Sequence, residues 1–367
     1  MNASGLRSTA VTARVGMMLG IAVGVCFLTG LVSHLIQHPQ PWFYWPAHPA
    51  WLYRVTQGLH VASGIAAIPL TVVKLWSVWP KLFERPIIGG LTRQLERLSI
   101  LVLVGAILFE LSTGLLNIAQ WYVFRFFFTT THYAVAYLAA GAVLVHLAVK
   151  LPVIRCALGE PLDELSTAAV GPTRRTVLRG TGLAVAAATV ATAGQTVPWL
   201  RRMSVLAPRS GQGPQGIPVN RTAVAAGVLQ TAASPQYRLT VTNGALSRAF
   251  SVSELNALPQ QTFHLPIACV EGWSADAAWT GVVLADLIAM VGGSRDADVR
   301  MVSLEPPGPY SRTVLPAGHA HDGQTLIALK LNGDTLHPDH GYPCRLIAPS
   351  RPGVLQTKWL SRIEVLP

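Results

Sequence analysis

The chain has 367 residues, of which 51% are hydrophobic and only 12% are charged, a composition too apolar for a protein that is soluble throughout. Its net charge of +11 is unevenly placed, because residues 1–199 carry 14 Lys and Arg against 6 Asp and Glu, whereas residues 200–367 carry 14 against 11. No basic run interleaves with aromatic residues, which excludes nucleic acid as a partner. The four cysteines show neither zinc-ligand spacing nor a disulfide framework.

Four apolar runs in the first 155 residues are long enough to cross a bilayer as helices: 15–37, 59–79, 98–121 and 132–151. Basic residues precede the first run and follow the second and the fourth. The connections between the first and second runs, and between the third and fourth, carry only Arg54 and Arg125. The positive-inside rule then places the N-terminus and the 80–97 loop in the cytoplasm.

Three histidines lie in or at the edges of these runs, and ionisable groups in a membrane are functional candidates. His132 and His146 are separated by about 21 Å along one helix. The arrangement resembles the four-helix cytochrome b subunits of membrane formate dehydrogenases and hydrogenases. The resemblance implies that His60 and His132 bind the iron of one outer b-type haem, with His146 left for a second haem. The alternative is that the histidines only bridge helices by hydrogen bonds.

Glu110 lies inside the third run, where a carboxylate is costly unless it is paired or functional. One interpretation is a local hydrogen bond to Ser112 or Thr113, or a protonated carboxyl group. The other is a proton carrier at a quinone site, because quinone chemistry moves protons together with electrons.

Residues 156–215 are predicted to be a linker that contains a fifth membrane helix at about 176–199. Arg174 and Arg175 precede this weakly hydrophobic run. They fit either the basic flank of an ordinary helix or an internal twin-arginine export signal, which we favour. No cleavage site follows, so the helix would remain as an anchor. A tether rich in Gly, Pro, Ser and Gln occupies residues 208–218.

Residues 216–367 are predicted to form an α+β domain of short strands. An alternating run at 237–242 ends at Asn243-Gly244, which is typical of a hairpin. Ser251 and Glu254 have the spacing of a capping box at the start of a short helix. A helix-like stretch follows at 282–291. Further strands are predicted at 299–304, 325–331, 344–348 and 361–366.

An apolar run, Leu265-Pro-Ile-Ala-Cys269, is predicted to be a core strand that ends on a cysteine. The plain interpretation is a buried cysteine that packs as a small hydrophobic side chain. The alternative is a thiolate presented to a soft metal. Cys344 is the competing thiol, and a Cys269–Cys344 disulfide without any metal is a third interpretation.

Two sequence blocks favour the metal. Cys269-Val-Glu-Gly-Trp273 is followed by Trp279-Thr-Gly281, and His340-Gly-Tyr-Pro-Cys-Arg345 is followed by Thr357-Lys358-Trp359. Together they resemble the molybdopterin enzymes of the sulfite oxidase fold, over about residues 216–367. The periplasmic methionine sulfoxide reductase branch fits best, because sulfite oxidase has an arginine-rich run where this chain has Val270-Glu-Gly-Trp273.

The resemblance implies that Cys269 is the single protein ligand of molybdenum and the centre of catalysis. It implies donors for the pterin and its phosphate at Arg345 and Lys358, with His340, Thr357 and Glu271 beside them. Asn220 and Arg221 match the first pterin contact of the family. For Arg345 and Lys358 the plain alternative is a surface ion pair. His319 and His321 fit either a substrate-facing segment or an ordinary polar loop.

These observations predict a multi-domain bacterial protein: a transmembrane four-helix bundle at 1–155, a fifth anchoring helix, and an exported α+β molybdopterin domain of sulfite oxidase type at 216–367. The predicted function is oxygen-atom transfer at molybdenum, with sulfoxide reduction preferred over sulfite oxidation. Expected partners are the bilayer, a quinone pool or another redox partner, a small-molecule substrate, and the twin-arginine translocase during export. The rival interpretation is a membrane-anchored binding domain that keeps the fold without metal.

Overall fold

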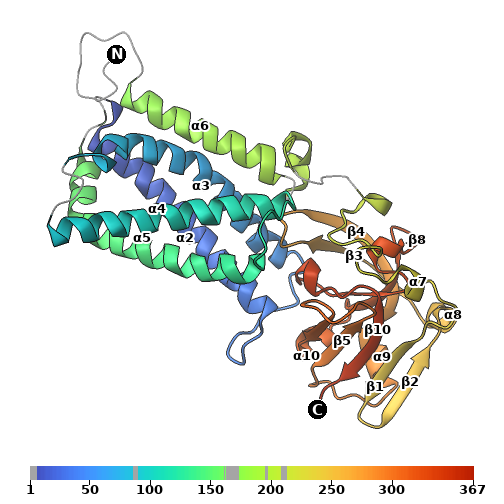
Figure 1. Ribbon diagram of the computed structural model, residues 1–367. Coiled ribbons are helices and arrows are strands. Elements are labelled where there is room, and N and C mark those ends of the chain that lie inside the picture. The colour runs from blue at the N-terminus through green and yellow to red at the C-terminus, as the bar shows by residue number, and fades with distance from the viewer. Residues whose placement is uncertain (1–5, 86–89, 161, 163–172, 195–196, 208–212) are drawn as a thin grey trace. The chain divides into compact units, whose positions relative to one another are not determined.

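The computed structural model describes residues 6–85, 90–160, 162, 173–194, 197–207 and 213–367 (Figure 1). The chain forms two compact units. The first comprises Met1–Val32 and Gly58–Pro208, and the second comprises Ser33–Gln57 and Arg209–Pro367. Most of the predicted linker at 156–215 before the fifth helix lies outside the described residues.

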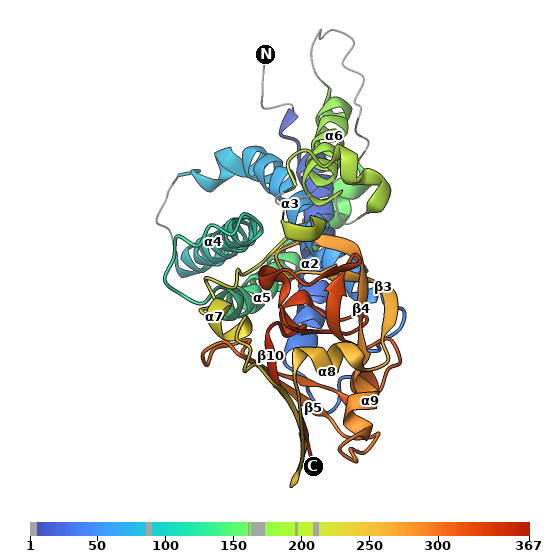
Figure 2. The ribbon, with the colours of Figure 1, turned by 90° about the vertical axis from the view of Figure 1, so that its right-hand side faces the viewer.

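Five helices are long and apolar enough to cross a membrane. They are α2 (Thr9–Gln37), α3 (Leu52–Leu82), α4 (Leu91–Ile118), α5 (Phe128–Gly159) and α6 (Arg174–Ala193). The helices of the first unit lie side by side (Figures 1 and 2). Val11 and Val15 pack against Ala67 and Leu70 between α2 and α3. The buried contact between α4 and α5 uses small residues such as Ala106 and Ala139, which let the two backbones approach closely.

Two of the predicted helices extend too far at their C-terminal ends, whereas the fourth run, predicted to end at residue 151, continues to Gly159. The third run was predicted to reach residue 121, but α4 ends at Ile118 because Gln120 takes a left-handed backbone conformation with φ 50°. The fifth was predicted to reach residue 199, but α6 ends at Ala193. A separate 3-10 helix follows at Pro198–Met203, and it begins on a proline, which cannot continue an α-helix from the preceding turn.

The second unit contains two five-stranded sheets. One has the order β2-β1-β10-β5-β6, formed by β1 (Leu239–Asn243), β2 (Leu246–Phe250), β5 (Val299–Ser303), β6 (Arg312–Leu315) and β10 (Leu360–Val365). The other contains β3 (Gln261–Ala268), β4 (Ser274–Val283), β7 (Leu326–Leu331), β8 (Asp334–Thr335) and β9 (Arg345–Ile347). Only the pairing of β1 with β10 is parallel among the described strand pairs.

The sequence of β7, Leu-Ile-Ala-Leu-Lys-Leu, is apolar at five of six positions because both faces of this strand are buried. Ile327 and Leu329 join the core cluster that contains β1, β5 and β10. Leu326, Ala328 and Leu331 join a second cluster with β3 and β4. The second cluster includes Cys269, so β7 separates the larger core from the layer that carries the cysteine.

Most predicted elements of the second unit are confirmed. The hairpin of β1 and β2 turns at Gly244, which has φ 55°. Helix α8 (Val252–Ala257) carries the complete capping box between Ser251 and Glu254. The predicted helix at 282–291 is too long, because Val282 and Val283 still pair with β7 and helix α9 covers only Leu284–Ala289.

Candidate active site

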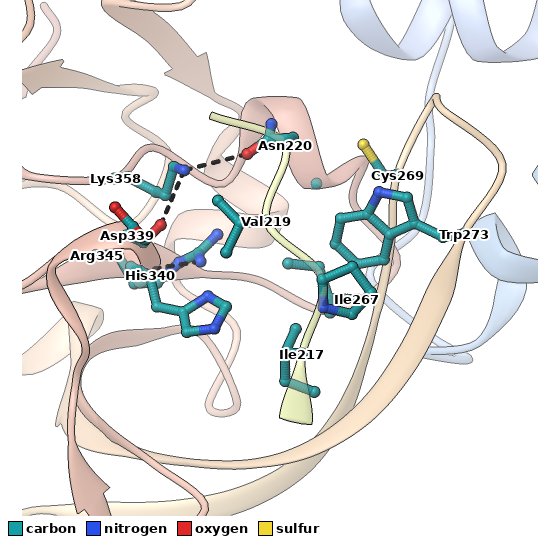
Figure 3. Close-up of a pocket in the computed structure, with 12 residues that line it drawn as sticks. Ile217, Val219, Asn220, Ile267, Cys269, Trp273, Asp339, His340, Arg345 and Lys358 are labelled. Atoms are coloured by element: carbon teal, nitrogen blue, oxygen red, sulfur yellow. Dashed lines mark hydrogen bonds between the residues drawn. The ribbon is translucent and has the colours of Figure 1, made fainter. Parts of the chain in front are cut away.

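A pocket in the second unit lies where β3 ends. Its walls come from four separate parts of the sequence: Ile217–Asn220, the end of β3 with Trp273, the turn before β9, and the chain on either side of the 3-10 helix Gly353–Leu355. Figure 3 shows Cys269 and Trp273 on one side of the pocket and Lys358, Arg345 and His340 on the other.

Cys269 follows β3 directly and begins a tight turn. Its backbone N–H donates to Trp273 O at 2.9 Å, and Gly272 N–H donates to Cys269 O at 3.1 Å. Gly272 has φ 85°, a conformation that favours glycine, so the Glu-Gly-Trp sequence after the cysteine suits this turn. The thiol is buried, and that burial raises its pKa well above its usual range, with the nearby Glu271 charge adding to the effect. The sulfur of the metal-free protein is therefore a protonated thiol.

Two cationic side chains, the buried Arg345 and the half-buried Lys358, form the opposite side of the pocket. Arg345 lies on β9 and donates to His340 O at 3.0 Å and to Gln356 O at 3.2 Å. Lys358 Nζ donates to Asn220 Oδ1 and Asp339 O, each at 3.1 Å, and to Arg221 O. Every acceptor in these described contacts is an uncharged oxygen, although the nearby Glu305 and Asp339 charges act on Lys358 and raise its pKa. The prediction of a surface ion pair is therefore wrong for both residues.

Burial affects the two cations differently. It lowers the pKa of Lys358 to about 7, and the neighbouring Arg345 charge contributes to that shift. Burial lowers the pKa of Arg345 to about 9, so its guanidinium stays charged at neutral pH. Within the described part of the chain, Arg345 Nε is buried and has no hydrogen-bond partner. Cations held by uncharged oxygens, one of them with a spare donor, favour the binding of an anion, because an anion would compensate for the hydration that they have lost.

Two residues of the motifs hold these cations in place. The fully buried Trp279 of β4 lies with its ring centroid 5.3 Å from the Arg345 guanidinium carbon. Gly341 has φ 108°, and a Cβ there would lie 3.0 Å from Arg345 Cβ and 3.1 Å from Lys358 Cβ. The glycine after His340 therefore allows both cationic side chains to approach the same turn.

His340 and Asn220 line the pocket, as does Asp339, which the sequence did not indicate. Burial lowers the pKa of His340 to about 4, so the ring is neutral and its Nε2–H donates to Pro214 O at 2.7 Å. Pro214 belongs to the predicted tether. The described end of that tether is thus part of the domain, because Gln215 also donates to Leu331 O at 3.1 Å.

Three predicted binding residues do not line the pocket. Thr357 is buried and its hydroxyl lies 2.8 Å from Thr313 Oγ1. Arg221 is exposed and lies 3.5 Å from Glu305, so only its backbone oxygen reaches Lys358. Glu271 accepts a hydrogen bond from Trp273 Nε1 at 3.0 Å and so fixes the turn after the cysteine. His319, on α10 (Ala317–Ala320), is buried outside the pocket, and burial lowers its pKa to about 4.

Cys269 and Cys344 are both free thiols and belong to different core clusters, so the predicted alternative of a disulfide between them is wrong. Among the described residues, no group of three His, Cys, Asp or Glu side chains could hold a metal alone. A metal at Cys269 would need most of its ligands from another molecule. A pterin dithiolene with a phosphate fits this donor set, because the thiol and the two cationic side chains lie on opposite sides of one pocket.

In the first unit, the rings of His60 on α3 and His132 on α5 lie 6.4 Å apart between centroids. His60 Nδ1 is 2.8 Å from Cys26 O, which leaves Nε2 to face another ligand. His146 lies fourteen residues beyond His132, about 21 Å along the helix, and so belongs to a different level of α5.

Glu110 pairs with His132 rather than with Ser112 or Thr113, so that local interpretation is wrong. The Glu110 Oε2 atom lies 3.1 Å from His132 Nε2, and Thr113 Oγ1 lies 3.0 Å from His132 Nδ1. Because α4 and α5 pack closely, tertiary contact takes precedence over the neighbouring hydroxyls. The Nε2 atom of His132 is thus already engaged by a carboxylate.

Comparison with known proteins finds a match to one protein family. The model of the family described as the oxidoreductase molybdopterin binding domain matches residues 226–367. The chain is 40% identical over 99 residues to the NADH nitrate reductase of Ulva prolifera, covering 24% of this chain and 11% of that protein. It is 29% identical over 155 residues to the mitochondrial sulfite oxidase of Drosophila melanogaster, covering 35% and 27%.

A third relative is the putative protein-methionine-sulfoxide reductase subunit YedZ1 of Azospira oryzae. It is 33% identical over 117 residues, which cover 32% of this chain and 44% of that protein. The chain therefore spans less than half the length of each of these three relatives.

Proposed function

We propose that this chain, whose residues 226–367 are a molybdopterin-binding oxidoreductase domain, is a membrane-anchored enzyme that transfers oxygen atoms and exchanges electrons with the membrane. The observation that carries the proposal is the pocket itself. It places a buried thiol on one side and the cationic side chains of Arg345 and Lys358 on the other, with apolar Ile217 and Ile267 between them (Figure 3).

Each residue of the pocket would have a separate task. Cys269 would bind molybdenum through its sulfur, after loss of the thiol proton, and Arg345 and Lys358 would bind the pterin phosphate. Asn220 and Asp339 would orient Lys358 through the hydrogen bonds described above. When bound, the cofactor supplies oxygen-atom transfer coupled to two electrons. Glu271 and Trp273 would keep the cysteine turn closed against water.

We favour reduction of a sulfoxide-type substrate, in which a sulfoxide takes up two electrons and two protons and gives a thioether and one water molecule. The sequence Val270-Glu-Gly-Trp273 after the cysteine supports this choice, as does the similarity to a protein named as a methionine-sulfoxide reductase subunit. Membrane quinol is the proposed source of electrons and protons. Similarity to sulfite oxidases and nitrate reductases makes sulfite oxidation the reaction to compare directly.

A b-type haem held by His60 and His132 is the proposed electron carrier between quinol and the pocket, and a second haem at His146 is a weaker extension. The closeness of the two rings supports the first site. Glu110 beside His132 supports proton exchange there, since the pair lies inside helices of membrane-spanning length.

We further propose that the molybdopterin domain lies outside the cytoplasmic membrane and is exported by the twin-arginine translocase. Five spans with a cytoplasmic N-terminus place the C-terminus outside. A buried cofactor must be inserted into a folded domain, and this requirement favours a translocase that accepts folded proteins.

Cys269→Ser tests the proposal. Serine has no soft thiolate, so the variant should lose molybdenum and all oxygen-atom transfer while keeping its circular dichroism. Cys344→Ser is the matched control, because Cys344 is equally buried in the same domain but faces Tyr237 rather than the pocket. It should cost about 1–2 kcal/mol of stability and keep its molybdenum. Full activity in Cys269→Ser would overturn the proposal.

A further inference from the structure

The segment Ser33–Gln57 belongs to the second unit although residues 58–208 separate it from the rest of that unit. Two of its contacts with the molybdopterin domain are buried or backbone-mediated. Ser350 N–H donates to Ala50 O at 3.1 Å, and Trp45 Nε1–H donates to Ser350 O at 2.7 Å. Ser350 is buried, and Ala50 packs against the core cluster that contains Cys269.

Two ion pairs flank these contacts. His48 Nε2 lies 2.7 Å from Asp322 Oδ2, and Arg54 Nη2 lies 2.7 Å from Asp276 Oδ1. In each pair one side chain is 53% exposed, so each pair contributes only about 0–1 kcal/mol. The ion pairs mainly orient the segment. The half-buried Trp45 and the backbone hydrogen bond contribute most of the free energy that holds the segment on the domain.

A chain of buried hydrogen bonds leads from this segment to the cysteine turn. Ser33 Oγ lies 3.1 Å from Tyr53 OH, which donates to Gln57 Oε1 at 3.3 Å. Gln57 Nε2–H then donates at 3.2 Å to the carbonyl of Val270, the residue after Cys269. Tyr53 and Gln57 are both buried. Losing this donor would leave the Val270 carbonyl without the Gln57 partner and free the turn to open.

We propose that the segment Ser33–Gln57 is a permanent structural part of the molybdopterin domain and that Gln57 is a positioning residue for the Cys269 turn. It deepens the proposed function, because the turn matters only if Cys269 carries the metal. This segment comprises the end of α2, the connection and the start of α3, and it is then a docking arm that holds the active-site turn closed, in addition to linking two helices.

Disulfide trapping tests the docking in the full-length protein. The backbone hydrogen bond between Ser350 and Ala50 brings these residues within reach of a disulfide, so Ala50→Cys with Ser350→Cys should cross-link on mild oxidation. Thr262→Cys with Thr280→Cys is the positive control, because these residues face each other on β3 and β4. Cross-linking of the control pair without the Ala50–Ser350 pair would overturn the docking.

Thiol labelling in the metal-free protein tests the positioning role. Gln57→Leu removes the donor at similar volume, and alkylation of Cys269, followed by peptide mapping, should become about tenfold faster, equivalent to about 1.4 kcal/mol. Gln40→Leu is the matched control, since Gln40 lies in the same segment but donates to His38 O at 3.3 Å, outside the chain of hydrogen bonds that leads to Val270. Cys344 is the internal reference and should not change.

Equal Cys269 labelling in Gln57→Leu, Gln40→Leu and the parent would overturn the positioning role. Neither measurement requires molybdenum. A negative result therefore leaves the assignment of Cys269 as a metal ligand intact, and a molybdenum-free parent would leave the docking result intact.

Discussion

At the scale of single residues, the site is governed by the burial of groups that would normally be hydrated. The Cys269 thiol and Arg345 are buried, Lys358 is half-buried, and no carboxylate hydrogen-bonds the two cations among the described contacts. Such a site is costly without its ligand, because buried charges are stabilising only when something pairs with them. The ligand would therefore contribute to folding as well as to chemistry.

The titration of Lys358 makes the stability of the metal-free protein and its binding of anions depend on pH. Its pKa of about 7 lies below its ordinary value of 10.5, so between these values the unfolded chain binds more protons than the folded one. The stability of the metal-free protein should therefore rise with pH through that window and be lowest below about pH 7. Sulfate, which needs the protonated lysine, should bind up to about tenfold more weakly per pH unit above 7.

Isothermal titration of the metal-free protein with sulfate between pH 6 and 8.5 measures this dependence. Lys358→Met should remove it, whereas Lys330→Met, on β7 outside the pocket, should keep it. A sulfate affinity that does not change over this range would contradict the assignment of Lys358 to the anion.

At the scale of elements, the cysteine layer depends on a close contact between β4 and β7. The register shifts between Thr280 and Gly281, and a Cβ on Gly281 would lie 2.1 Å from Ile327 O. Gly281→Ala should therefore lower the free energy of unfolding by about 3 kcal/mol. Gly323→Ala, where a Cβ meets nothing within 4 Å, should have little effect. Thermal unfolding of the two detergent-solubilised variants measures the difference, and equal midpoints would contradict the close contact.

Helices α3 and α5 carry the proposed haem ligands, and their variants separate haem binding from proton transfer. His60→Ala should abolish a b-type absorption spectrum by removing an axial ligand. Glu110→Gln should keep the spectrum but slow reduction by quinol, because glutamine still hydrogen-bonds His132 and carries no proton. His146→Ala should keep the spectrum of the outer haem.

Optical spectra and stopped-flow reduction of the purified variants distinguish these outcomes. A parent protein without haem absorption would end the haem proposal, and an unchanged quinol rate in Glu110→Gln would exclude Glu110 from proton transfer.

At the scale of the whole molecule, the proposed export determines on which side of the membrane the molybdopterin domain lies. Replacing Arg174 and Arg175 by Lys keeps the charge at the start of α6 but removes the arginine pair that a twin-arginine translocase reads. The molybdopterin domain should then stay in the cytoplasm while the first four helices insert normally. Protease digestion of spheroplasts would show this, and normal export would reduce the pair to an ordinary basic flank.

The sequence by itself determined the elements whose signals are local. Apolar length indicated the five long helices, the capping box of Ser251 and Glu254 began α8, and two motif blocks identified Cys269, Arg345 and Lys358 as residues of one site. These properties depend on neighbours a few positions away or on a family resemblance, so no tertiary information was needed.

Tertiary structure alone decided which partners those residues meet. Glu110 pairs with His132 on another helix rather than with its neighbour Thr113, and Thr357 turns to Thr313 instead of the pocket. Gln57 reaches Val270 across 213 residues of sequence. The reason in each case is burial. A polar group removed from water needs a hydrogen-bond partner close to it in space, and that partner can lie anywhere along the chain.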